Sequence, residues 1–188
     1  MLRPGAFWFA LTFATASLAA QQISAELEPA RTRVDWTLGA TLHMVHGTFK
    51  LKRGTLTFDP SSGRASGQIV VDVTSGESGN ETRDRKMRRE VLESQRYPEA
   101  VFIVNSVAGR LAASGRSHLE FQGTLRIHGA DHEIALPADA DRTGDEATAT
   151  FHFVIPYVTW SMKNPSNLVL KVSDHVDMDV STTVHLRN

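Results

Sequence analysis

Two runs with an apolar residue or glycine at every second position constrain the fold of this chain more than any other feature. They extend from Leu119 to Ile127 and from Ala149 to Tyr157, and in the first run every residue between the apolar ones is polar. Successive side chains of a β-strand point to opposite faces, so each run predicts a strand with one apolar face. Such strands form antiparallel sheets that are wet on one side.

Further segments have the same β-branched and aromatic character. The expected strand regions are 34–38, 41–60, 67–75, 100–109, 117–129, 132–140, 146–160 and 168–186. Turn-forming residues separate several of them, at 59–63, 128–132 and 141–146. About eight to ten strands at this spacing predict an all-β sandwich or barrel. A closed barrel of about eight strands has no exposed edge and can hold a ligand inside.

One charged segment, residues 78–98, interrupts this pattern and is predicted to be a short helix. Asn80 or Thr82 could cap its start, and Asp84 lies in the first turn, where the helix dipole favours an acid. Pro98 ends it before the next strand. Its apolar stripe is Met87, Val91 and Leu92. We expect this helix to cover the barrel, with its start near Arg83 and Asp84 at the border of a ligand entrance.

The N-terminus is typical of a secretory signal peptide. Arg3 precedes an apolar stretch over residues 6–16, and small residues offer a cleavage site after residue 19 or 20. We expect a signal peptide over residues 1–20, a short leader over 21–31 and one β-barrel domain over 32–188. The chain has no cysteine, and we expect a periplasmic or secreted protein without disulfides.

The charge balance argues against nucleic acid as a partner. The 188-residue chain carries 20 Lys and Arg against 21 Asp and Glu, for a formal net charge of -1. The charged segment 78–98 has a local net charge of only +2, from six basic and four acidic residues. A nearly neutral chain has no global field that attracts polyanions.

The histidines are the only candidates for metal chemistry. His43 and His46 would point to opposite faces of a strand, which suits isolated histidines better than a joint site. His128 and His132 flank a predicted turn and, with Asp131, could hold a metal, although zinc sites need three or four well-placed ligands. The chain contains no G-x-S-x-G elbow and no phosphate-binding glycine loop. We therefore expect no catalytic residues, no metal and no cofactor.

The chain resembles the YceI-like family of exported lipid-binding proteins. The resemblance rests on "VHGTF" with "GTLTFDP", "TRDRKM" with "VLESQRYPEAVF", "GTLRIHG" and "LVLKVSDHVDMDV". It implies a lipocalin-like antiparallel barrel with one short helix and an apolar tunnel for a long isoprenoid, such as an isoprenoid quinone, or a fatty lipid. It also implies that the protein is not an enzyme. A homodimer and transient contact with a membrane surface are compatible with this expectation.

Inward-facing aromatic and aliphatic residues are the candidates for the tunnel wall, because ligand pockets are mostly apolar with a few polar anchors. Arg83, Asp84 and Tyr157 are the candidates for holding a head group at its mouth. The expected ligand-binding residues are Trp36, Phe49, Val71, Arg83, Asp84, Phe102, Leu125, Phe151, Phe153, Ile155, Tyr157 and Trp160.

Two other functions fit the sequence. One is a structural or adhesive β module whose interior is filled by side chains, and the other is a metal-dependent hydrolase built on the histidines. Cavity volume distinguishes the carrier from the packed module, since a continuous apolar tunnel favours the carrier.

Overall fold

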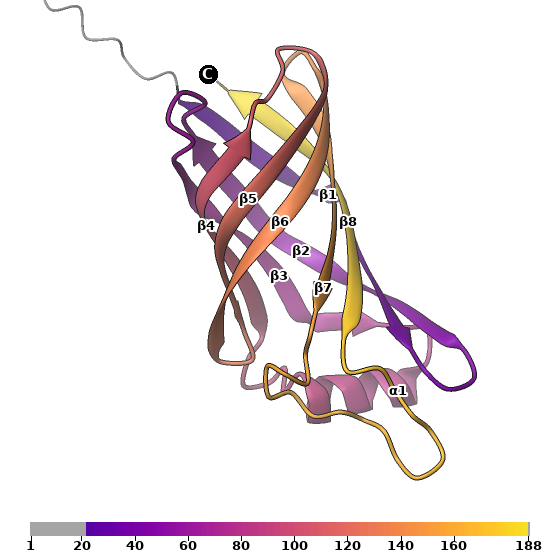
Figure 1. Cartoon of the computed structure of the whole chain (residues 1–188). Helices are drawn as coiled ribbons and strands as arrows, with labels where there is room; N and C mark the ends of the chain where they lie inside the picture. The colour runs from indigo at the N-terminus through magenta and orange to yellow at the C-terminus, as the bar shows by residue number, and fades with distance from the viewer. Residues whose placement is uncertain (1–21, 188) are drawn as a thin grey trace, which may run out of the picture.

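The chain forms one closed antiparallel β-barrel, as predicted (Figure 1). The computed structural model describes residues 22–187, so the expected signal peptide over residues 1–20 lies outside the described part. Each strand pairs with the next in sequence, and the last pairs with the first. The strands are β1 (Ile23–Gly39), β2 (Met44–Phe58), β3 (Ala65–Glu77), β4 (Glu99–Gly109), β5 (Gly115–Ile127), β6 (Ala130–Thr143), β7 (Glu146–Ile155) and β8 (Val176–Arg187).

The predicted alternation decides which side chains enter the barrel. In β5, the residues at every second position from Leu119 to Ile127 are buried, and the residues between them face outward. At the end of the barrel near the chain termini, large side chains pack against small ones and nearly fill the interior. Phe58, Leu119 and Phe121 meet alanines 138, 140, 147 and 149 there, around a void of only about 50 Å³.

The other end of the barrel is covered by the predicted helix (Figure 1). It consists of α1 (Glu81–Lys86), continued by a single π-helical turn, η1 (Met87–Val91). Asn80 is the N-cap, since its side-chain oxygen accepts a hydrogen bond of 3.0 Å from the backbone N–H of Arg83. The stripe of Met87, Val91 and Leu92 packs against the core. Both helical pieces are too short to cross a membrane, and no other helix occurs within residues 22–187.

Three boundaries differ from the sequence prediction. The expected leader over 21–31 is mostly part of β1, which begins at Ile23; its alternation is interrupted by a register shift after Leu27 that obscured the strand. β7 ends at Ile155, because Pro156 has no N–H for the ladder. β8 begins only at Val176, and residues 168–175 belong to the loop between β7 and β8.

Gly47 allows the ring of Trp36 to lie flat against the barrel wall. The two residues are partners across β1 and β2. A Cβ atom at Gly47 would lie 2.2 Å from Cζ2 of Trp36 and 2.3 Å from the carbonyl oxygen of Glu77. Side chains with a Cβ are therefore excluded here, and the glycine fixes the position of the largest aromatic ring in the wall.

We predict that Gly47→Ala lowers the free energy of unfolding by about 1–3 kcal/mol, because the tryptophan ring must shift in a packed wall. Urea unfolding followed by circular dichroism measures this change. Gly39→Ala is the matched control, because a Cβ there would meet nothing closer than the Ser173 hydroxyl oxygen at 3.3 Å. Equal stability losses in the two variants would contradict the account of Gly47.

Candidate functional site

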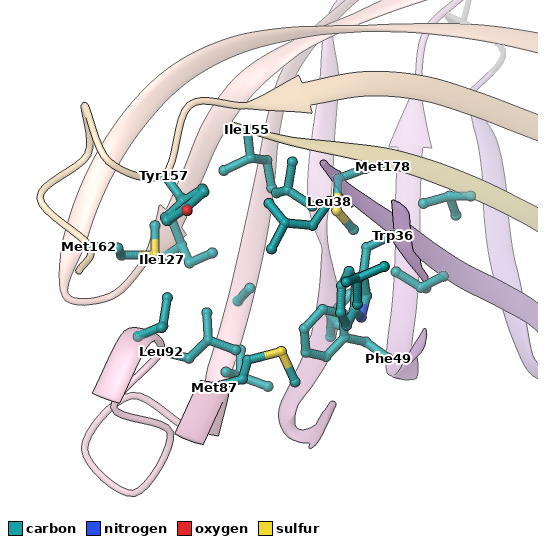
Figure 2. Close-up of a pocket in the computed structure, with 18 of the residues that line it drawn as sticks. Trp36, Leu38, Phe49, Met87, Leu92, Ile127, Ile155, Tyr157, Met162 and Met178 are labelled. Atoms are coloured by element: carbon teal, nitrogen blue, oxygen red, sulfur yellow. The ribbon is translucent and has the colours of Figure 1, made fainter. Parts of the chain in front are cut away.

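The half of the barrel beneath the helix is hollow. A cavity of about 510 Å³ extends from Leu27 and Thr32 in the middle of the barrel to the helix. This volume lies within the range of roughly 300–1,000 Å³ that is typical of ligand pockets. Figure 2 shows its wall, in which Met87 and Leu92 of the helical segment face Trp36, Phe49 and the strands. The helix therefore roofs the cavity and does not plug it.

The wall of the cavity is apolar along its length. Inside the barrel the hydroxyl of Thr32 is satisfied, because it lies 2.6 Å from that of Thr182 and donates to the Glu28 carbonyl oxygen at 2.7 Å. The indole Nε1 of Trp36 is covered by other atoms and has no hydrogen-bond partner within the described residues. A buried polar group is costly only when it lacks a hydrogen-bond partner. Because Thr32 has its partners, it does not require a polar group of a ligand. The middle of the cavity therefore suits a ligand made of carbon and hydrogen.

Within the described residues, exposed polar side chains border the cavity only at the helix end. They are His43, Asn80, Thr82 and Lys86. Three segments meet there: the hairpin between β1 and β2, the start of α1, and the loop between β7 and β8, which contributes Pro165 and Leu170. The cavity thus has one polar, solvent-facing mouth and an apolar interior.

Ten of the twelve predicted site residues line this cavity. They are Trp36, Phe49, Val71, Arg83, Phe102, Leu125, Phe151, Phe153, Ile155 and Tyr157. Phe151 and Phe153 are only half-buried although they face inward, because the space beside them is empty. These ten residues make up one part of the wall, and the other lining residues were not predicted.

Asp84 and Trp160 do not line the cavity. Asp84 is buried beside the helix start, where it accepts a hydrogen bond from the Ser78 hydroxyl. Trp160 lies in the loop after β7 and stacks on His132, with ring centroids 4.0 Å apart and an interplanar angle of 9°. Both side chains therefore make contacts with other protein groups, and neither faces the cavity.

Arg83 is the cation built into the mouth. Its Nε donates to the Ser78 hydroxyl oxygen at 2.7 Å, and its Nη2 donates to the Ser78 carbonyl oxygen at 2.9 Å. Ser78 in turn donates to Asp84. This chain of hydrogen bonds orders the guanidinium, so a polar ligand group reaching the mouth would meet a positioned charge.

Tyr157 closes the wall on the side of the loop between β7 and β8. Its hydroxyl donates to the Ser173 carbonyl oxygen at 2.6 Å, which ties the two ends of this loop together. Burial, together with the nearby negative charge of Asp174, raises the pKa of Tyr157 to about 12. The phenol is therefore a neutral hydrogen-bond donor over the whole physiological pH range.

We predict that stability falls as the pH rises from 10 towards about 12, because the ordinary pKa of 10.0 applies to Tyr157 in the unfolded chain and the raised one in the folded chain. The unfolded state then loses its proton first and is favoured. In Tyr157→Phe the free energy of unfolding should fall less over the same pH range, because the variant has no phenol at this position. Urea unfolding at a series of pH values measures it, with Tyr97→Phe as the control that retains Tyr157. Parallel pH profiles for wild type and Tyr157→Phe would contradict the assignment.

Sequence reasoning missed several residues of the wall. The helix stripe was expected to cover the barrel, but Met87, Val91 and Leu92 also face the cavity. Inward positions of β8 were missed as well, although their alternation from Val176 through Met178 to Val180 could have identified them. Met162 could not have been found, because it reaches the wall from an irregular loop. Met87, Met162 and Met178 are flexible side chains that can adjust to the shape of the space beside them.

The histidines are held apart by separate contacts. His128 packs against Tyr97 at a ring-centroid distance of 4.9 Å, whereas His132 stacks on Trp160. His46 lies 3.0 Å from the Thr37 hydroxyl, and His43 borders the cavity mouth. Within residues 22–187, no group of three or more His, Cys, Asp or Glu side chains could hold a metal ion.

These features define a closed antiparallel β-barrel with an internal apolar cavity that opens at one end. The chain belongs to the YceI-like domain family, whose model matches residues 26–184. The resemblance seen in the sequence is thereby confirmed.

Relatives and solved structures agree with this assignment. A UPF0312 protein of Pseudomonas putida (strain W619) is 27% identical over 191 residues, covering 92% of this chain and 93% of its own. Burkholderia cenocepacia BcnA shares the fold with a TM-score of 0.68 at 18% identity, over 84% of this chain and 98% of its own. A structure described as a polyisoprenoid binding domain from Saccharophagus degradans has a TM-score of 0.64 at 16% identity, over 86% and 97%.

Proposed function

We propose that this protein is an exported carrier or sequestering protein that binds one long isoprenoid or acyl lipid in the barrel. The observation that carries the proposal is the cavity of about 510 Å³, whose wall is apolar from Leu27 to the helix. Each Å² of apolar surface removed from water contributes about 25 cal/mol before the costs of binding. A long hydrocarbon chain can therefore be held without many polar contacts.

The polar mouth gives the bound lipid a direction. Arg83, Lys86 and His43 border the cavity at the helix end, and the opposite end is closed by packed side chains. A lipid would enter tail first and leave its polar head group beside Arg83. This arrangement favours a ligand with one polar end, such as an isoprenoid quinone, a polyprenyl lipid or a fatty amide.

Two further observations support this function. The related domain from Saccharophagus degradans is described as polyisoprenoid binding. The N-terminal sequence is typical of a signal peptide, which would bring the carrier to the periplasm or the cell exterior, where lipids must cross water between membranes.

The two rival hypotheses receive less support. A packed structural module does not need a hollow half-barrel, whereas a carrier does. A hydrolase built on His128 and His132 would need them to converge, but each ring packs on a different aromatic side chain.

Lipid extraction followed by mass spectrometry tests the proposal most simply. The protein purified without detergent should release a long-chain isoprenoid or acyl lipid into organic solvent, in an amount approaching one per chain. Protein that releases no such lipid, and that takes up none when the delipidated form is offered a range of long-chain lipids, would refute the carrier function.

We predict that Ala100→Phe abolishes lipid loading, because Ala100 faces the cavity and a phenyl ring would occupy the space of the ligand. Val101→Phe is the matched control: Val101 is the next residue of β4, it does not border the cavity, and its ring would point outward. Lipid uptake is measured by mass spectrometry, after circular dichroism has shown that both variants fold. Equal uptake by the two variants would place the ligand elsewhere.

A further inference from the structure

The loops at the cavity mouth carry large apolar side chains in full contact with solvent. Leu168 is 100% exposed, Val169 is 88% exposed and Leu42 is 86% exposed. Isolated surface apolar residues are common and need no explanation. These three are the most exposed large apolar residues of the described chain, and they belong to the two loops that border the mouth. We call Leu42, Leu168 and Val169 the apolar tip.

The turn that presents Leu168 and Val169 does not need apolar residues. Asn167 builds it: its side-chain oxygen accepts hydrogen bonds from the backbone N–H groups of Val169 and Leu170 at 2.9 and 2.8 Å, and its own N–H donates to the Leu170 carbonyl oxygen at 2.8 Å. Corner positions of such turns usually carry Gly, Pro, Asn, Asp or Ser. The backbone geometry therefore leaves the leucine and valine unexplained.

Hydrogen bonds join the two loops into one unit. The N–H of Thr41 donates to the Lys171 carbonyl oxygen at 3.0 Å, and the N–H of Lys171 donates to the Thr41 hydroxyl oxygen at 2.9 Å. Ala40 and Val172 form an antiparallel bridge beside them. Leu42 in one loop and Leu168 with Val169 in the other are thus carried by a shared support, next to residues that line the cavity.

Positive charges outnumber negative ones around the apolar tip. Neither segment 40–44 nor segment 160–173 contains an acidic residue, and Asp174, which follows, pairs with His175. Lys171 is exposed and has no ion-pair partner within residues 22–187. The helix at the same end exposes Arg85, Lys86 and Arg89, the last paired with Glu90, against one exposed acid, Glu81. Exposed apolar side chains flanked by cations are the combination that binds the interface of an anionic lipid bilayer.

We propose that the apolar tip inserts into the surface of a bilayer that contains anionic phospholipids and sets the cavity mouth on that membrane. This inference rests on the proposed lipid-carrier function, for which it supplies the loading step. A lipid tail that leaves the bilayer beside the apolar tip enters the cavity under the helix without crossing open water. Lys171 and the helix cations hold the protein to the phosphate layer.

Vesicle sedimentation tests the proposal. The mature wild-type chain should bind vesicles of phosphatidylglycerol and phosphatidylethanolamine, and bind phosphatidylcholine vesicles less. Leu168→Ser should weaken the partition by about tenfold, the loss expected from one buried leucine side chain, and Leu168→Ser with Val169→Ser by more. Val154→Ser is the matched control, because Val154 is half-exposed on the outer wall of β7. Its binding should equal that of wild type.

A charge reversal separates the electrostatic contribution. Lys171→Glu should weaken binding to the anionic vesicles several-fold and leave the weak binding to phosphatidylcholine unchanged. Arg110→Glu is the control, since Arg110 is exposed in the loop between β4 and β5 at the opposite end of the barrel. It should bind as wild type does.

Mass spectrometry of the extracted lipid distinguishes this inference from the carrier function itself. The variants of the apolar tip should reach wild-type occupancy when lipid is supplied in solvent, but load more slowly from vesicles. If no form of the protein holds lipid, the carrier function is refuted. If the protein holds lipid but does not bind vesicles, only the membrane contact is overturned. Wild-type vesicle binding by the double serine variant would also overturn it. So would a wild-type dimer that these serines convert to a monomer, because the apolar tip would then be an interface between copies.

Discussion

The pairing of β8 with β1 is the interaction on which the rest of the structure depends. It closes the sheet, so that every strand is hydrogen-bonded on both sides and alternate side chains are committed to one shared interior. An interior of eight strands is just wide enough for side chains to fill. Near the termini they do fill it, with Phe58 and Phe121 against alanines. Towards the helix they do not, and the apolar cavity is what remains.

The two ends of the cavity differ because they are closed in different ways. Packed side chains seal one end, whereas the other is covered by a helix. Its apolar stripe of Met87, Val91 and Leu92 faces inward, and Arg85, Lys86 and Arg89 are exposed to solvent. The helix start is fixed by Asn80 and by the hydrogen bonds from Arg83 to Ser78. A hydrocarbon chain can therefore occupy the interior while a polar group stays beside an ordered cation.

Most of the fold could be predicted because strand alternation and helix capping are local signals. The strand from Leu119 to Ile127 lies where the alternation put it, and Asn80 is one of the two caps that the sequence offered beside Thr82. The wall residue Phe153 followed from the alternation of residues 149–157, and Trp36 from its place as an aromatic residue in a predicted strand. Asp84 was placed wrongly, because only the tertiary structure shows that its carboxylate meets Ser78. Leu168 and Val169 were predicted to lie in a strand because they are apolar. They lie in a turn that is held by hydrogen bonds to the Asn167 side chain, and such hydrogen bonds cannot be seen in a pattern of apolar residues.

A crystal structure of the protein loaded with a long-chain isoprenoid would show whether the barrel cavity holds the lipid. We predict continuous density for one extended or folded lipid chain from the neighbourhood of Thr32 to the helix, with the polar head beside Arg83 and no ligand density among the packed residues around Phe121. A cavity filled by rearranged side chains, or a ligand whose head group lies at the end near Phe58, would contradict it.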